Sequence, residues 1–249
     1  MMGSLHRKYS RHVNSLHRSE ADSHDARALA ELASLGGGAL PWTDFSMRPA
    51  AIAGAVTDAI VNRHWRIVEC GSGNSTVFLA RLLAQIGEGS LVSLEHDGHW
   101  ASLTRELLAR DGVADRAAVV HAPLVGGWYD RDAVPDVTGI DLLIVDGPPA
   151  HTQGAGQDRQ PALDVFHDRL AADATVLVDD AQRPGEQAVM ARWHDEHGIA
   201  FARRRGGFAV GSVAAQAAGQ ATARRPGRAQ RSIRSGGRPR RISKRVYLP

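Results

Sequence analysis

The middle of the chain alternates between apolar runs that end in an acidic residue and stretches in which apolar residues recur with a helical spacing. The apolar runs cover residues 66–69, 91–95, 140–146 and 174–180. Continuous Val, Ile and Leu over such lengths is typical of strands buried on both faces of a sheet. The stretch 76–86 has the pattern of a crossover helix between two parallel strands. Together these patterns predict an α/β fold with a doubly wound, mostly parallel sheet.

The remaining pattern extends this architecture. Helices are predicted over residues 47–61 and 100–110 and from Pro184, and a strand is predicted over residues 117–121. Further along, two short apolar runs flank a basic, glycine-containing turn at residues 203–207. These two runs predict a terminal antiparallel hairpin.

Two glycines lie between the first predicted strand and the first predicted helix. Gly71 and Gly73 permit a tight turn whose backbone approaches a ligand, and Asn74 or Ser75 is placed to cap the helix. An ordinary strand-to-helix turn has the same composition, so this pair alone leaves both interpretations open. Glu95 follows about twenty residues later, where an open α/β sheet places a carboxylate against ribose hydroxyls. The combination predicts a nucleotide-like cofactor.

The segment Glu69-Cys-Gly-Ser-Gly resembles motif I of class I S-adenosylmethionine-dependent methyltransferases, in which an acid precedes two glycines. A dinucleotide-binding fingerprint is the competing match. It requires a third glycine or alanine where this chain has Thr76, and it does not require the acid at Glu69. The resemblance implies S-adenosylmethionine as cofactor and a Rossmann-like, seven-stranded sheet whose last strand inserts antiparallel.

The same resemblance implies a set of cofactor contacts. It places Glu69 near the methionine part of the cofactor and His96 beside the adenosine ring. The cofactor-binding residues expected on this basis are Glu69, Gly71, Ser72, Gly73, Ser75, Glu95, His96 and Asp146.

Three carboxylates are expected to meet at the carboxyl ends of the later strands. Asp146, Asp179 and Asp180 match the metal-binding positions of the metal-dependent O-methyltransferases that the chain resembles, the group that includes catechol and macrocin O-methyltransferases. Carboxylates suit Mg²⁺, which would hold an acceptor hydroxyl and lower its pKa. The alternative is structural: Asp180 caps the helix that begins near Arg183, and Asp179 bonds to backbone amides.

The catalytic residues expected from the sequence are Asp146 and His151. His151 lies in the loop after Asp146, and a neutral imidazole there would take the acceptor proton near pH 7. The segment Asp146-Gly-Pro-Pro also resembles the Asp-Pro-Pro-aromatic motif of amino-group methyltransferases that act on nucleic acid bases. That likeness fails because a glycine intervenes and Ala150 occupies the aromatic position.

The chain as a whole is similar to uncharacterised bacterial methyltransferases over residues 40–212. The shared segments are Leu40-Pro-Trp-Thr, Trp128-Tyr-Asp, Asp146-Gly-Pro-Pro, Arg159-Gln-Pro-Ala-Leu and Asp179-Asp-Ala-Gln-Arg.

Two loops are further candidates for the acceptor site. Residues 123–137 form a long aromatic loop, which is expected to be a pocket wall or lid, or else ordinary surface packing. Arg159 and Arg183 are candidates for recognising an anionic or sugar-like acceptor. The alternative for each is solvation or a salt bridge to the acidic cluster.

Length and composition limit the number of domains. A chain of 249 residues with 43% hydrophobic residues holds one α/β domain, expected at 40–213. Residues 1–39 are expected to be a partly helical extension.

The single cysteine, Cys70, excludes an internal disulfide and is expected to be a small buried residue. No apolar run has the length of a membrane span, and the amino-terminal residues lack a secretory core, so a cytoplasmic enzyme is expected.

The carboxyl-terminal residues 214–249 are expected to be a disordered basic tail. Residues 224–245 carry ten basic residues and no acid, although the net charge of the whole chain is only +3.

The function expected from all these features is O-methylation of a small-molecule or glycan hydroxyl. The alternative is a nucleic-acid-associated protein, either an RNA methyltransferase or a non-catalytic binder, that uses this tail. The other interpretation of the segment is a dispensable, solvated tail, since it has few aromatic residues to stack on bases. The oligomeric state is not predicted.

Overall fold

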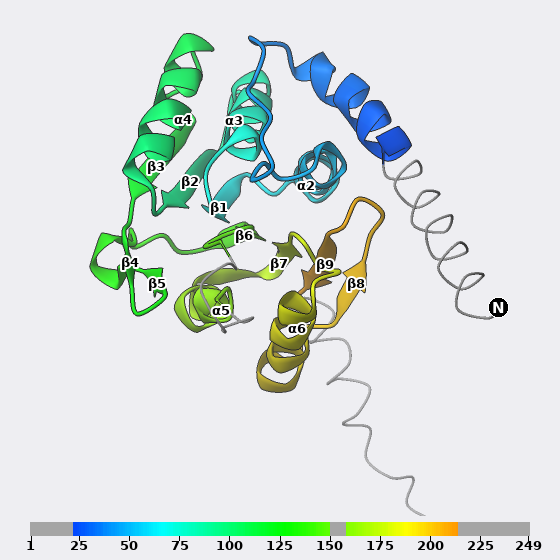
Figure 1. Ribbon diagram of the computed structural model, residues 1–249, viewed down its shortest axis with the longest axis vertical. Coiled ribbons are helices and arrows are strands. Elements are labelled where there is room, and N and C mark those ends of the chain that lie inside the picture. Colours follow the sequence, from blue (N-terminus) through cyan, green and yellow to red (C-terminus); the bar gives the residue numbers. More distant parts are fainter. Residues whose placement is uncertain (1–21, 150–157, 214–249) are drawn as a thin grey trace, which may run out of the picture.

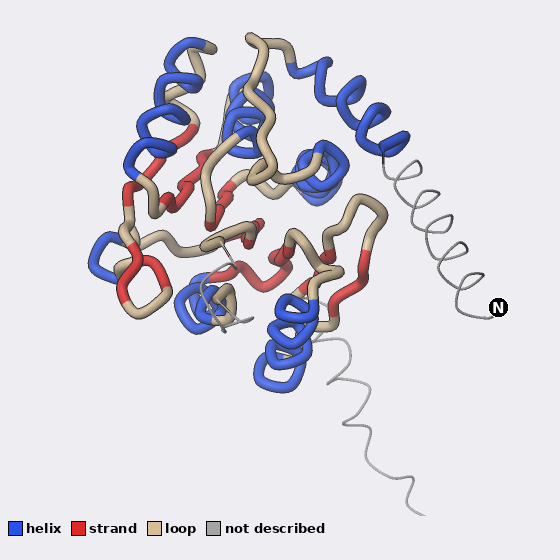
Figure 2. The backbone as a smooth tube through the Cα atoms, in the orientation of Figure 1, coloured by secondary structure: helices blue, strands red, loops and turns tan. Residues whose placement is uncertain are grey.

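The computed structural model describes residues 22–149 and 158–213 and shows a three-layer α/β/α arrangement (Figure 1). Helices α2, α3 and α4 cover one face of a central sheet, and α5 and α6 cover the other (Figures 1 and 2). The helices are α2 (Pro49–Asn62), α3 (Asn74–Ile86), α4 (Gly98–Arg110), α5 (Pro161–Phe166) and α6 (Pro184–His197). None of the helices in the described ranges has the length and apolar character that crossing a bilayer requires.

The central sheet has seven strands in the order β3-β2-β1-β6-β7-β9-β8. The strands are β1 (Arg66–Cys70), β2 (Ser90–Glu95), β3 (Ala117–His121), β6 (Ile140–Val145), β7 (Leu170–Val178), β8 (Phe201–Arg203) and β9 (Ala209–Ser212). The first five of these in chain order pair in parallel, whereas β9 runs antiparallel between β7 and β8. The predicted doubly wound, mostly parallel seven-stranded sheet with a terminal hairpin is therefore confirmed.

Alternate residues of the central strands feed two separate apolar cores. In β6, Leu142 and Ile144 pack into the core under α2, α3 and α4, whereas Leu143 and Val145 pack into the core under α5 and α6. Successive side chains of a strand point to opposite faces, so a strand covered on both sides is apolar throughout. This is why the apolar run from 142 to 145 shows no alternation in the sequence.

Several short elements lie outside the predicted pattern. Residues 123–137, expected as a long loop, contain the hairpin β4 (Leu124–Val125) and β5 (Trp128–Tyr129) and the single turn η2 (Arg131–Ala133). The two aromatic residues of β5 are buried, and their rings meet edge to face with centroids 5.0 Å apart. Further single turns are η1 (Ala33–Leu35) and η3 (His167–Arg169). Residues 22–32 are helical and lie in the extension that was expected to be partly helical.

Candidate active site

The turn between β1 and α3 brings two loops of the sheet edge together. Gly71 has a φ of +97°, and its N–H donates to the Leu94 carbonyl at 2.9 Å. A Cβ atom at Gly71 would lie 3.3 Å from the backbone nitrogen of Gly147, which follows β6. Both the positive φ and the close approach favour glycine here. The turn is thus packed against the loop that carries Asp146.

Glu69 and Thr76 hold the start of α3. The Gly73 N–H donates to Thr76 Oγ1 at 3.0 Å, and Thr76 Oγ1–H donates to Glu69 Oε2 at 2.5 Å. Glu69 is fully buried, and burial raises its pKa to about 7, although hydrogen bonds from neighbouring hydroxyls counteract part of the shift. Thr76 therefore has a role that the third glycine of a dinucleotide fingerprint does not have: it caps the helix and donates to one oxygen of the buried acid.

Glu95, at the end of β2, receives donors from two other segments. Oε2 accepts hydrogen bonds from the Ser72 N–H at 3.0 Å and from the Ser72 hydroxyl at 2.8 Å. Oε1 accepts from the Asp97 N–H at 3.0 Å and lies 3.0 Å from His96 Nδ1. Asp97 in turn caps α4 by accepting from the His99 and Trp100 amides. The carboxylate is thereby fixed in direction at the carboxyl edge of the sheet.

A cavity of about 310 Å³ opens above this edge. Its volume is in the range of small-molecule sites. The turn at 71–75, the end of β2 with His96, and Asp146 with Gly147 line it, and so does the hydroxyl end of Tyr129. Of the cofactor-binding residues expected from the sequence, Gly71, Ser72, Gly73, Ser75, Glu95, His96 and Asp146 line the cavity, whereas Glu69 lies beneath its floor.

The cavity has two further walls, of which the sequence indicated only the one around Trp42 and Met47 as a cover of the cofactor entrance. One is the face of α4 with Trp100, Leu103 and Leu107, and the other is the segment 41–47 with Phe45, which is 68% exposed, and Met47. The apolar spacing of the α4 residues predicted a helix, but it did not indicate that this face would line a ligand cavity. The walls make the cavity apolar on the sides and polar at the floor.

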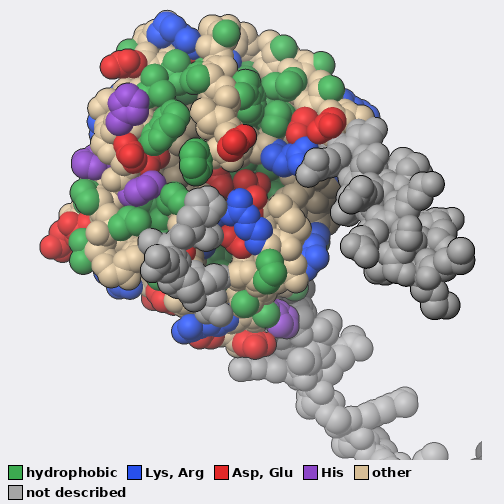
Figure 3. Space-filling view, in the orientation of Figure 1, with side chains coloured by type: hydrophobic (Ala, Val, Ile, Leu, Met, Phe, Trp, Pro, Cys, Tyr) green, Lys and Arg blue, Asp and Glu red, His purple; other side chains and the backbone are tan. Residues whose placement is uncertain are grey.

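The three predicted metal ligands converge. One carboxylate oxygen from each of Asp146, Asp179 and Asp180 lies within 4.8 Å of the others. Figure 3 shows acidic side chains beside a basic group near the middle of this face. Burial raises the pKa of Asp146 to about 7, and burial and the neighbouring acids raise that of Asp179 well above its usual range. Such a cluster attracts protons or a cation.

Arg159 lies inside this cluster, and its side chain is only 4% exposed. Its Nη2 lies 3.3 Å from Asp146 Oδ1 and 3.5 Å from Asp180 Oδ2, and its Nη1 lies 3.7 Å from Glu186 Oε1. It also donates to the backbone carbonyls of Asp146 at 2.6 Å and Asp179 at 3.1 Å. Of the two alternatives for Arg159, the salt bridge to the acidic cluster is the one observed.

Asp180 does not cap α6. The residue at the cap position is Arg183, which makes no side-chain capping bond, and Arg183 Nη1 lies 2.8 Å from Asp180 Oδ2. Asp180 has a φ of +56°, an uncommon conformation for a residue other than glycine. This backbone conformation accompanies a carboxylate that faces Arg159 and Arg183.

The expected base, His151, lies outside the described residues, as does the basic segment 224–245.

A family model described as a methyltransferase domain matches residues 68–181. The catechol O-methyltransferase of Mycobacterium tuberculosis is 30% identical over 184 residues, which cover 72% of this chain and 74% of that protein.

Solved structures share the fold. The O-methyltransferase TomG of Streptomyces achromogenes, solved with S-adenosylmethionine, is 22% identical with a TM-score of 0.52, over 78% of this chain and 89% of that one. A methyltransferase of Podospora anserina, solved with S-adenosylhomocysteine, is 14% identical with a TM-score of 0.55, over 82% and 94%. At these identities the likeness establishes the fold.

Proposed function

Because the chain belongs to the class I S-adenosylmethionine-dependent methyltransferases, we propose that it transfers the methyl group of S-adenosylmethionine to a hydroxyl oxygen of a small-molecule or glycan acceptor. The observation that carries this proposal is the cavity at the carboxyl edge of the sheet, which Glu95 and Asp146 both line. Open α/β sheets bind ligands at this edge. The relative of known activity with 30% identity is an O-methyltransferase, which favours an oxygen acceptor.

The proposed orientation of the cofactor follows from the residues that line the cavity. Glu95, at the end of β2, accepts the ribose hydroxyls, and His96 with Trp100 and Leu103 borders the adenine. The turn at 71–75 then lies against the methionine part, which points toward Asp146. In this orientation the buried Glu69 acts through Thr76 on the shape of the turn and does not touch the cofactor.

The acceptor oxygen is placed beside Asp146 in line with the methyl group. The oxygen attacks the methyl carbon, the sulfur–carbon bond breaks, and S-adenosylhomocysteine leaves while the acceptor proton passes to a base. We propose that His151 is this base. Positioning is the main contribution of the protein, since the sulfonium is already a good leaving group.

The charge of the acidic cluster fits a divalent cation. Four carboxylates, those of Asp146, Asp179, Asp180 and Glu186, face two guanidinium groups. Two negative charges remain when all four acids are ionised. Burial is the main cause of the raised pKa values of Asp146 and Asp179, and the neighbouring acids add to it. We propose that Asp146, Asp179 and Asp180 hold Mg²⁺. When bound, the ion lowers the pKa of an acceptor hydroxyl.

Calorimetric titration of the purified protein with S-adenosylmethionine, S-adenosylhomocysteine and NAD tests the cofactor. Saturable binding of the first two and not of NAD is expected. Methyl transfer from labelled cofactor is then screened against catechols, other phenols and sugars. Failure of both sulfur-containing ligands to bind would overturn the proposed function.

The metal is tested separately by calorimetric titration of the cofactor-bound protein with Mg²⁺. Binding that is lost in Asp179→Asn supports the site independently of turnover. Equal Mg²⁺ binding by the parent protein and this variant would remove the metal from the proposal and leave the cofactor assignment intact.

A further inference from the structure

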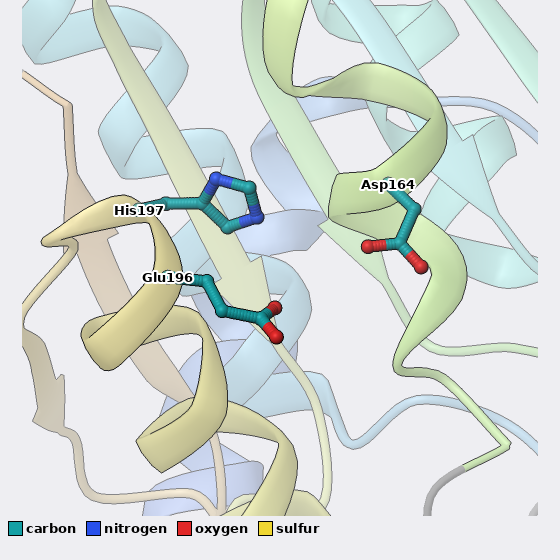
Figure 4. Close-up of side chains that lie close together, drawn as sticks. All are labelled: Asp164, Glu196 and His197. Atoms are coloured by element: carbon teal, nitrogen blue, oxygen red, sulfur yellow. The ribbon is translucent and has the colours of Figure 1, made fainter.

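A second group of metal-ligating side chains lies at the carboxyl-terminal end of α6, beside α5. Asp164 belongs to α5, and Glu196 and His197 are the last two residues of α6. One ligand atom of each lies within 4.8 Å of the other two. Figure 4 shows the His197 ring and the two carboxylates pointing toward one another from the two helices. None of the three belongs to the acidic cluster of the active site.

His197 distinguishes this group from an ordinary acidic surface. Its Nε2 atom is buried and has no hydrogen-bond partner within the residues that the structure describes. Its ring stacks on that of His167, with centroids 4.3 Å apart and planes inclined by 25°. Buried polar atoms are rarely left without a partner, and a neutral imidazole offers a lone pair on one nitrogen. Because the stacking fixes the plane of the ring, the direction in which Nε2 of His197 can bind a partner is also fixed.

Both carboxylates keep acceptor positions free. Asp164 accepts from the side-chain amide of Gln160 at 3.1 and 3.2 Å, and Glu196 accepts from Arg192 Nε at 2.7 Å. A carboxylate has about four lone-pair positions, so these contacts do not saturate it. The group therefore combines one unpartnered nitrogen with two carboxylates that have room for another partner.

We propose that Asp164, Glu196 and His197 form a binding site for a borderline transition-metal ion, Zn²⁺ in particular. One imidazole with two carboxylates suits Zn²⁺, whereas Mg²⁺ prefers oxygen ligands. Two bonds from zinc to its ligands span roughly 4 Å, so small side-chain rotations close the present arrangement on an ion. Three protein ligands leave one position of a tetrahedral ion to water.

The ion stabilises the pairing of α5 with α6. These helices already touch, since Trp193 Nε1 donates to the Gln160 carbonyl at 3.0 Å. Arg159 precedes α5 and Arg183 precedes α6, and both contact Asp180. A ligand that binds only the folded state raises stability as its concentration rises. Zn²⁺ thus stabilises the contact between α5 and α6, the helices that adjoin the acidic cluster, and takes no part in methyl transfer.

The test is a calorimetric titration of the full-length, chelator-treated protein with Zn²⁺ in excess Mg²⁺, together with thermal unfolding with and without Zn²⁺. The variants are His197→Ala and Glu196→Gln, and the matched control is His194→Ala, an exposed histidine of the same helix. We expect Zn²⁺ affinity at this site to fall at least about tenfold in the first two and to persist in the control. The Zn²⁺-induced rise in unfolding temperature should follow the same pattern.

Two results would overturn the proposal. One is unchanged Zn²⁺ binding in both His197→Ala and Glu196→Gln. The other is loss of Zn²⁺ binding in Asp179→Asn, which would assign the ion to the acidic cluster of the active site. Glu196→Gln keeps the imidazole stack, so it tests the site even where His197→Ala fails to fold.

Discussion

The Glu95 carboxylate accepts hydrogen bonds from the protein's own backbone, so we expect cofactor binding to depend on its negative charge. The amides of Ser72 and Asp97 both point at its oxygens. We expect Glu95→Gln to weaken S-adenosylmethionine binding by about 2 kcal/mol, roughly 30-fold in Kd. The amide nitrogen of the glutamine would face one of these donors, and the ribose would lose a charged acceptor. Calorimetry measures the change.

The control for this variant is Glu88→Gln, which changes an exposed acid after α3. Its affinity for the cofactor should equal that of the parent protein. Equal affinities in all three proteins would exclude Glu95 as a ribose contact.

Asp146 and Asp179 are expected to act on turnover more than on cofactor affinity. Asp146→Asn keeps an oxygen for Arg159 but removes the charge that faces the acceptor. We expect kcat to fall at least about 100-fold in Asp146→Asn and in Asp179→Asn, while Kd for the cofactor changes less than about threefold. Steady-state kinetics on an acceptor found by screening measures the first effect. Asp173→Asn, an exposed residue of β7, is the control. Full turnover in both site variants would exclude these residues from the chemistry.

The buried Glu69 predicts a pH-dependent stability. Burial raises its pKa from 4.5 to about 7, so the folded state binds a proton more tightly than the unfolded state does. Its contribution to stability is full below about pH 4.5 and is lost as pH rises to about 7. Glu69→Gln lacks this loss, so its free energy of unfolding relative to the parent protein should increase between pH 5 and pH 7 and then level off. Urea unfolding across this range measures it. A pH-independent difference, like that expected for the exposed Glu106→Gln, would contradict the assignment.

Arg159 connects four elements, because it bonds to the residues after β6 and β7 and faces Glu186 of α6 while it precedes α5. Removing one partner of a buried ionic network leaves uncompensated charge. We expect Arg159→Met to lower the free energy of unfolding by about 3–5 kcal/mol, as measured by urea titration. The exposed pair Arg27–Glu31 provides the comparison, since Arg27→Met should cost less than about 1 kcal/mol. Equal losses in the two variants would contradict a structural role for Arg159.

The long elements could be predicted from the sequence, and the short ones could not. Strand β6 and helix α3 have enough apolar residues in one pattern to identify them. Helix α5 spans only Pro161–Phe166, and strand β5 spans only Trp128–Tyr129, so neither shows a period. Both owe their conformation to the core that they cover. The acidic residues at the ends of the apolar runs indicated where the parallel strands end at one edge of the sheet.

The candidate active site could also be predicted only in part from the sequence. The convergence of Asp146, Asp179 and Asp180 was predictable because parallel strands end at one edge of the sheet. The position of Arg159 was not, because whether an arginine meets solvent, a ligand or an acid depends on contacts between distant segments. Thr76 carried a usable signal, since a hydroxyl three residues after Gly73 is placed to cap a helix.

The chain as a whole combines the seven-stranded sheet of the described residues with a basic carboxyl-terminal sequence. Within the described residues the last strand in chain order is β9, which pairs with both β7 and β8 and ends at Ser212. We propose that residues 40–213 form the catalytic domain, flanked by the extension 1–39 and the tail 214–249. A protein truncated after residue 213 should keep the unfolding temperature and the cofactor affinity of the full chain.

The full chain and the truncated protein should differ in binding to polyanions. Residues 224–245 carry ten basic residues, and counterion release makes binding through such a segment strongly salt-dependent. Titration with a labelled RNA at low and at physiological salt should show weak, salt-sensitive binding by the full chain and none by the truncated protein. Methyl transfer to a small acceptor should be equal in the two proteins, because the cavity and the acidic cluster lie within residues 41–186. If truncation abolished methyl transfer while cofactor binding persisted, the acceptor would be a nucleic acid that the tail recruits.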